Sequence, residues 1–402
     1  MEDFDISKKI LSLLLVIVIS FTSLHTTADA HENKLVKVNE DNIEELIVAT
    51  ALAWAEMIEP ELEFTVSDII RINSVYSNEI EYTASLFCEA VPYGYVVIGF
   101  DDNSVVVKEA NISRRKEGLY TEIVDWIDEN TDEPRKNLDI DETITKLSPL
   151  HYGLSYEDSK GNIYITDNYG NDLSDEEELF CGTKKYVSSY EIYISNANWL
   201  PSKYLTDPSS MVILKKYSAR YTLKSDEDIE KITYSYACVV QALLQIAYME
   251  GLTTYSPEHI QDTYDKLWNY CKITQYEVNA KGIVFGEGTP TNAENGFLRF
   301  VKEAGYVNTD SAATNNPTVL WITDKLLRNY PVFMAYGINV NGNRSGHVIS
   351  ILGYRKAKAS SDGKTYDYLQ VYNSWDNTCA FLNYSTVDFM DCRAICFRIR
   401  MV

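Results

Sequence analysis

Hydrophobic positions in the first part of the chain change from helical to strand spacing. From Asp41 to about Glu59, apolar residues recur at the helical interval and stop near Pro60, which predicts an amphipathic helix. Three runs rich in β-branched and aromatic residues follow, separated by turn-forming residues: Tyr82–Ala90, Tyr93–Gly99 and Ser104–Val107. This alternation predicts an antiparallel meander.

The pattern weakens in the middle of the chain. Tyr120–Leu147 is charged and contains Pro134, which favours helical pieces joined by an exposed linker over a buried core. We therefore expect a domain boundary near this segment. His151–Leu205 indicates irregular or hairpin structure, and from about Met211 to Val402 the pattern predicts helices first and strands afterwards.

A buried helix is predicted to begin at Cys238 and to end at Gly251. Its apolar residues follow the i, i+3, i+4, i+7 spacing: Val239, Ala242, Leu243, Ile246 and Ala247. The helix macrodipole and the unsatisfied N–H groups at this end stabilise a thiolate and lower a cysteine pKa. Cys238 is therefore a candidate nucleophile, although the position also suits a small buried hydrophobic residue.

The first thirty residues have the layout of an export signal. Lys8 and Lys9 precede the apolar run Ile10–Ile19, and Ala28-Asp29-Ala30 forms an A-x-A cleavage site. The run is about half the ~20 apolar residues that a spanning helix needs. We expect a secreted, extracellular protein that has no membrane association after the signal is removed.

The net charge indicates which partners to expect, and the cysteines indicate which kinds of site. The formal net charge of −23 repels phosphate backbones, so nucleic acid is not expected as a partner. Seven cysteines are an odd number for an exported chain, which indicates at least one unpaired thiol. No cysteine pair has zinc-site spacing, and we expect neither a metal nor another cofactor.

Three of the five histidines are candidate bases. His347 follows Gly346 at the start of the second of two strand-like runs, so a rigid element holds the ring and the glycine leaves room beside it. His259 is expected at the exposed start of a helix. His151 is expected outside the catalytic core.

A third strand leads into Asn373-Ser374-Trp375. In a cysteine–histidine pair the imidazole needs a polar orienting group, and the Asn373 side-chain oxygen suits this role without adding a charge. Trp375 is expected to shield that hydrogen bond from water. The catalytic candidates are therefore Cys238, His347 and Asn373, and Trp375 and Gly346 support them.

This order of motifs resembles the papain-fold cysteine peptidases, and within them the streptopain family of bacterial secreted proteases. The similar segments are Cys238–Tyr248, Leu327–Phe333, Gly346–Tyr354 and Asn373–Trp375, with weaker similarity between Tyr93–Ile98 and the family's inhibitory propeptide. The chain departs from papain-like enzymes at Ile232, where those enzymes place an oxyanion-hole glutamine. It also inserts a polar segment, Lys356–Thr365, which we expect to be a flexible turn.

The resemblance implies an α+β fold in which a helical subdomain carries the cysteine and an antiparallel β subdomain carries His347 and Asn373. It implies a signal peptide at 1–30, an inhibitory pro-segment at 31–205 and a papain-like catalytic domain at 206–402. The implied activity is that of a cysteine endopeptidase made as a zymogen. Its expected partners are a protein or peptide substrate and its own pro-segment, and a monomer is expected.

Two other kinds of protein fit the same residues. One is another Cys-His-Asn acyl transferase or amidase, either transglutaminase-like or acting on cell walls. The other is an inactive secreted binding protein that keeps the fold.

Overall fold

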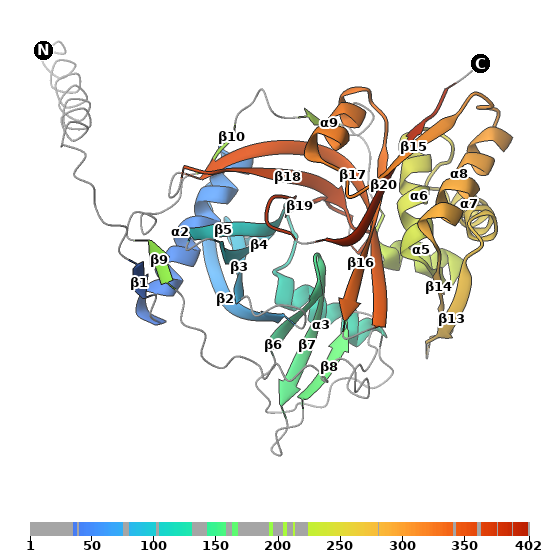
Figure 1. The fold of residues 1–402 in the computed structure, drawn as a ribbon. Coiled ribbons are helices and arrows are strands. Elements are labelled where there is room, and N and C mark those ends of the chain that lie inside the picture. Colours follow the sequence, from blue (N-terminus) through green and yellow to red (C-terminus); the bar gives the residue numbers. More distant parts are fainter. Residues whose placement is uncertain are drawn as a thin grey trace, which may run out of the picture.

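The computed structural model describes most of the chain and leaves several segments undescribed (Figure 1). The described residues are 35–37, 40–74, 80–101, 104–130, 143–157, 163–167, 193–195, 204–206, 212–213, 224–279, 281–340, 343–359, 363–375, 377–387 and 389–400. The expected export signal at 1–30 and Cys181 lie outside these residues. The described part is a mixed α/β structure with seven helices and one large sheet.

The first described helix and the strands after it confirm the expected helix and meander. Helix α2 (Glu40–Ile58) is followed by four strands: β2 (Thr65–Ser74), β3 (Glu81–Cys88), β4 (Val91–Asp101) and β5 (Ser104–Ile112). Adjacent strands from β2 to β5 pair antiparallel. Leu46, Ile47 and Ala51 of α2 form one core cluster with Val96 and Ile98 of β4, as the helical periodicity predicts.

The charged segment that we expected to be exposed helical pieces is partly a buried core. It contains helix α3 (Leu119–Asn130) and strand β6 (Thr143–Ser148), with residues 131–142 between them outside the described part. Ile123 and Ile127 of α3 are buried in a cluster with Ile144 of β6. The expectation was wrong because charged residues in this segment, Lys146 among them, are buried against charges of the opposite sign.

Strands β7 (His151–Glu157) and β8 (Ile163–Asp167) complete the first part of the sheet. β6, β7 and β8 pair antiparallel in sequence, which confirms hairpin structure after His151. Four short strands are also described before residue 220: β1 (Leu35–Lys37), β9 (Tyr193–Ser195), β10 (Tyr204–Thr206) and β11 (Val212–Ile213). β1 pairs with β9, whereas β10 and β11 both pair with the long strand β17.

The C-terminal half has helices first and strands afterwards, as predicted. Its helices are α5 (Asp226–Thr233), α6 (Cys238–Met249), α7 (Pro257–Tyr270), α8 (Pro290–Glu303) and α9 (Val319–Leu327). A small sheet contains β12 (Ser235–Tyr236), β13 (Thr274–Val278) and β14 (Val284–Glu287). The other strands are β15 (Asp310–Asn315), β16 (Val332–Val340), β17 (Asn343–Ala359), β18 (Thr365–Tyr372), β19 (Ala380–Asn383) and β20 (Met390–Arg398). Lys356–Thr365, expected to be a flexible turn, is strand at both ends, because β17 continues to Ala359 and pairs with β18, which begins at Thr365; residues 360–362 between them lie outside the described part.

One sheet runs through both halves of the chain. Its strand order is β15-β20-β16-β17-β18-β19-β5-β4-β3-β2-β6-β7-β8, so β5 of the first half pairs with β19 of the second. Beside this junction the backbone carbonyl of Val107 accepts hydrogen bonds from the Asn383 Nδ2–H, at 2.8 Å, and from the Tyr368 hydroxyl, at 3.0 Å. Trp54 of α2 packs on the Tyr368 ring with centroids 4.3 Å apart. The junction is therefore held by backbone pairing, side-chain hydrogen bonds and a shared apolar core.

Figure 1 shows α2 and the β2–β5 meander on one side of the molecule and helices α5–α8 on the other. Across the described ranges, no helix is both long and apolar enough to pass through a membrane.

Candidate active site

Cys238 is the first residue of α6, as the periodicity predicts. Ala237 precedes the helix in an extended conformation and makes no side-chain cap. Its carbonyl accepts the N–H groups of Val240 and Gln241, whereas the first N–H groups of a helix have no intrahelical partner. The macrodipole therefore places partial positive charge at the thiol.

Cys238 differs from the other described cysteines in its exposure. It is partly exposed, whereas Cys88, Cys271, Cys379, Cys392 and Cys396 are all buried. Burial raises the pKa of the Cys271 and Cys392 thiols to about 12, which keeps them protonated and unreactive. Of the described thiols, Cys238 therefore has the position best suited to a nucleophile.

His347 lies on β17, which packs directly on the helix of Cys238. The Ser350 hydroxyl of β17 donates to the carbonyl of Ala242 in α6 at 3.1 Å, and this contact ties the strand to the helix. The His347 side chain is 5% exposed and faces Tyr336 of β16, with ring centroids 5.9 Å apart. The ring is thus held by two paired strands.

The His347 ring contacts Asn373 through the backbone and not through the expected side chain. Nε2 lies 3.2 Å from the Asn373 carbonyl oxygen. Because a carbonyl only accepts, Nε2 carries the hydrogen, and in the neutral ring Nδ1 is left as the basic nitrogen. The Asn373 side-chain oxygen is buried and has no hydrogen-bond partner. The structure thus brings His347 and Asn373 together in an arrangement that leaves the expected orienting oxygen unused.

Trp375 covers the His347 ring, and Gly346 lies in the strand beside it. The indole is 5% exposed, with its centroid 5.0 Å from that of the imidazole. Ser374, between Asn373 and Trp375, adopts the left-handed region at φ 75°, which turns the chain sharply at this point. Gly346 is exposed and lies opposite Gly337 of β16, and an added Cβ would meet only the Tyr336 carbonyl, at 3.3 Å.

The structure also places His151 at this site, which the sequence analysis did not predict. Its ring packs on Trp375 with centroids 5.1 Å apart. His151 belongs to the segment that the sequence analysis places outside the catalytic core, and the tertiary structure brings its ring to the candidate site from that segment. No local pattern marks this histidine, because its position depends on strand β7 reaching the other half of the molecule. His259, in contrast, is exposed near the start of α7, as expected.

Burial and the neighbouring histidine change the protonation of His347. Burial and, to a smaller extent, the charge of His151 lower its pKa to about 3, against a smaller opposing effect of the hydrogen bond to Asn373. The imidazole is neutral at physiological pH in this arrangement. A thiolate–imidazolium pair is therefore disfavoured as long as His347 stays covered.

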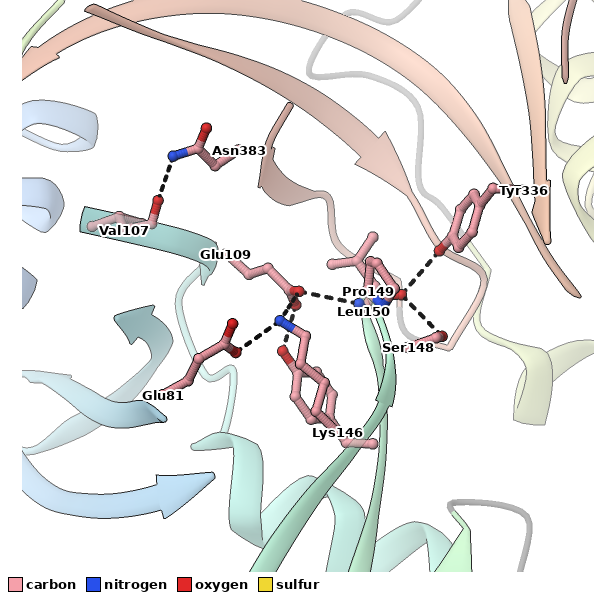
Figure 2. Close-up of polar contacts among 10 residues, drawn as sticks. Glu81, Val107, Glu109, Lys146, Ser148, Pro149, Leu150, Tyr336 and Asn383 are labelled. Carbon is pink, nitrogen blue, oxygen red and sulfur yellow. Dashed lines mark hydrogen bonds and ion pairs between the residues drawn. The ribbon is translucent and has the colours of Figure 1, made fainter. Parts of the chain in front are cut away.

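The cover is the tip of the β6–β7 hairpin, residues Ser148–His151. The Tyr336 hydroxyl donates to the Pro149 carbonyl at 2.9 Å, and Leu150 is buried in the apolar core of the C-terminal half (Figure 2). Leu150 adopts a left-handed backbone, at φ 60°, which aims the tip into the other half. The tip therefore lies against Tyr336 and Trp375, the two aromatic side chains that contact the His347 ring.

Two further properties of the site concern metal ligands and the donors for an oxyanion. In the described segments, no group of three or more histidine, cysteine or acidic side chains is arranged to hold a metal ion. Ile232, at the position of the papain oxyanion-hole glutamine, lies within α5 and packs against the core. Backbone N–H groups at the start of α6 are candidate donors for a developing oxyanion at Cys238.

Comparisons with known proteins find one distant structural likeness. No protein-family model matches the chain, and no curated protein matches its sequence. Among solved structures, the active wild-type interpain A cysteine protease of Prevotella intermedia aligns with a TM-score of 0.33 and 13% identity. The alignment covers 47% of this chain and 96% of interpain A. A TM-score of 0.33 at this identity does not establish a shared function.

Proposed function

We propose that this chain is a secreted cysteine endopeptidase made as a latent precursor. One observation supports it most: Cys238, the partly exposed thiol at the start of a buried helix, lies on α6, and α6 packs on β17, the strand that carries His347 beside Asn373 and Trp375. The order of these residues and their elements is that of a papain-like catalytic domain, which we propose for residues 206–402.

The reaction that this site supports is acyl transfer through a thioester. The Cys238 thiol transfers its proton to Nδ1 of His347, and the thiolate attacks the carbonyl carbon of a peptide bond. The tetrahedral oxyanion collapses, the C–N bond breaks, and the Nδ1 proton passes to the departing amine. The imidazole then takes a proton from water, the resulting hydroxide attacks the thioester, and the carboxylic acid is released with regeneration of the thiol.

The covered site supports the latent part of the proposal. The β6–β7 tip packs on Trp375, Tyr336 and the core of the C-terminal half, so its position excludes substrate from His347. We infer that residues 31–205 are the inhibitory pro-segment and that residues 1–30 are removed on export. In the active enzyme the His347 ring is uncovered, and the Asn373 side-chain oxygen becomes the acceptor for Nε2–H.

The test is self-processing of the chain. Residues 31–402 are prepared with native Cys238 and as Cys238→Ala, incubated under mild reduction and followed by intact mass. We expect the native chain to shorten to a fragment near residues 206–402 and Cys238→Ala to stay whole. His347→Ala serves as a second inactive variant, because it keeps the thiol.

Other outcomes favour the alternative functions. If both chains stay whole, limited proteolysis by an added protease followed by a thiol-directed peptidyl probe decides the question. Labelling of Cys238 without peptide hydrolysis favours another acyl transferase or an amidase. No selective labelling of Cys238 would remove the enzyme proposal and favour a binding protein.

A further inference from the structure

A buried network of charges lies directly behind the tip that covers His347. The Lys146 ammonium of β6 contacts the Glu109 carboxylate of β5 at 2.7 Å and the Glu81 carboxylate of β3 at 2.8 Å. The Tyr152 hydroxyl of β7 donates to the second Glu109 oxygen at 2.5 Å. The three charged side chains are 4%, 0% and 7% exposed respectively. Figure 2 shows the Lys146 ammonium between the two carboxylates.

Glu109 takes part in two of the contacts that join the two halves. Its backbone lies opposite Leu382 in the β5–β19 pairing, where the first half docks on the second. Its carboxylate accepts the backbone N–H of Leu150 at 3.2 Å, and Leu150 is the tip residue buried in the C-terminal core. The same side chain therefore connects the docking strand to the tip beside His347.

Burial of these charges favours a single arrangement of Glu109 and its partners. A buried carboxylate is tolerated only when it is paired and hydrogen-bonded, and removal of one partner leaves an uncompensated charge in a medium of low dielectric. Lys146 pairs with both acids only when β3, β5 and β6 keep their register. The network therefore favours one position of the tip, in which the Leu150 N–H reaches Glu109.

We propose that the network of Glu81, Glu109, Lys146 and Tyr152 is a latch. The latch couples docking of β5 on β19 to covering of His347. Separation of β5 from β19 moves the Glu109 carboxylate away from the C-terminal half, and the Leu150 N–H that this carboxylate accepts moves with it, so the tip is withdrawn from His347. If the junction opens, the precursor is activated in one step. This consequence rests on the proposed function.

The experiment uses the full chain, residues 31–402, as Lys146→Met. Methionine is an unbranched side chain only one atom shorter than lysine and has no charge, so Glu81 and Glu109 lose their counter-charge. We expect alkylation of Cys238 by iodoacetamide, quantified by peptide mass, to become about tenfold faster or more. We also expect faster hydrogen exchange in residues 143–157 and a rise in the NMR-measured pKa of His347 as the ring becomes hydrated.

Two matched variants separate the latch from general destabilisation. Ile123→Ala leaves a cavity in the core cluster that Ile123 shares with Tyr152, but it removes none of the network's charges or hydrogen-bonding groups, and we expect alkylation of Cys238 to stay within about twofold of the native rate. Lys266→Met removes a lysine of similar length whose pairing with Asp262 at 2.6 Å is exposed, and no change is expected. Acceleration in Ile123→Ala equal to that in Lys146→Met would overturn the proposal.

A milder variant covers the case in which Lys146→Met fails to fold. Tyr152→Phe removes only the hydroxyl donor to Glu109, and a smaller increase in the same direction is expected. Native rates of alkylation and exchange in both network variants would contradict the latch. Because neither readout requires turnover, these results differ from failure of the peptidase proposal, in which the processed native chain lacks activity.

Discussion

His151 and His347, from opposite halves of the chain, pack on the same indole ring. Their centroids lie 5.1 and 5.0 Å from that of Trp375. The contact joins the hairpin tip to the candidate catalytic base, and it places a second titratable ring beside a buried imidazole. Several measurable properties follow from this pairing.

Removal of the His151 ring is expected to raise the pKa of His347. His151→Ala takes away the neighbouring charge and opens space for water, and both effects favour the imidazolium. The measurement is an NMR pH titration of the histidine rings in the Cys238→Ala background, which prevents self-cleavage. His259→Ala, on an exposed helix, is the control and is expected to leave the His347 titration unchanged. An unchanged His347 pKa in His151→Ala would contradict the observed proximity.

Acid is expected to loosen the covered state. The pKa of His347 is about 3 when covered and near 6.5 when the ring is hydrated, so between these pH values the opened state binds a proton that the covered state does not. The covered state therefore loses stability as pH falls below 6.5, by up to about 1.4 kcal/mol per pH unit from this group.

The test of acid loosening compares two variants in urea unfolding at pH 7.5 and pH 4.5. Cys238→Ala contains the histidine, and Cys238→Ala with His347→Gln lacks the titrating group. We expect the protein with His347→Gln to lose less stability on acidification. The carboxylates are the same in both proteins, so their contribution is the same. The same loss in both proteins would mean that His347 is not buried as described.

Substitution of Asn373 is expected to change kcat of the processed enzyme more than the free energy of unfolding of the precursor. Its side-chain oxygen is buried without a partner, and an unsatisfied buried group costs roughly 1–3 kcal/mol. Asn373→Ala removes this cost but leaves a small cavity, so the free energy of unfolding of the full chain should change by less than about 1 kcal/mol.

In the processed enzyme, Asn373→Ala should lower kcat because the imidazole loses its orienting acceptor. We expect a decrease of about 10- to 100-fold, measured with a peptide substrate after removal of the pro-segment. A kcat equal to that of the native enzyme, with His347 uncovered, would exclude the orienting role.

Glu230 is expected to destabilise the protein at alkaline pH. The side chain is 8% exposed, and burial raises its pKa to about 7, partly opposed by Lys281. The folded state therefore favours the neutral acid, and stability is lost as pH rises from the unfolded pKa near 4.5 through 7. Glu230→Gln should raise the free energy of unfolding by roughly 2–3 kcal/mol at pH 8 and change it little at pH 4. Glu258→Gln, at an exposed position of α7, is the matched control, and an equal effect at both pH values in Glu230→Gln would contradict this account.

Local pattern was sufficient for the elements that carry the candidate residues. The helix of Cys238, the strand of His347 and the strand before Asn373 all lie where the periodicity predicts them. This is because helical and strand periods report which face of an element is buried, and a nucleophile or base is held by its own element.

The charged middle segment shows where local pattern is insufficient. The charged composition of this segment predicts that Lys146 is solvent-exposed. Its side chain is only 4% exposed, because Glu81 and Glu109 neutralise its charge. These acids lie 65 and 37 positions away along the chain, so no window around Lys146 contains the charges that allow it to be buried.

The sequence by itself therefore determined the helix that presents the thiol, the strands that hold the imidazole and the asparagine, and the order of the three residues. Only the tertiary structure decided that β5 pairs with β19, that the β6–β7 tip lies on Trp375, and that the Asn373 backbone contacts the ring in place of its side chain. The physical reason is that propensity and periodicity act over neighbouring residues. Strand pairing, burial of charge and the covering of a site depend instead on which distant surfaces meet when the chain folds.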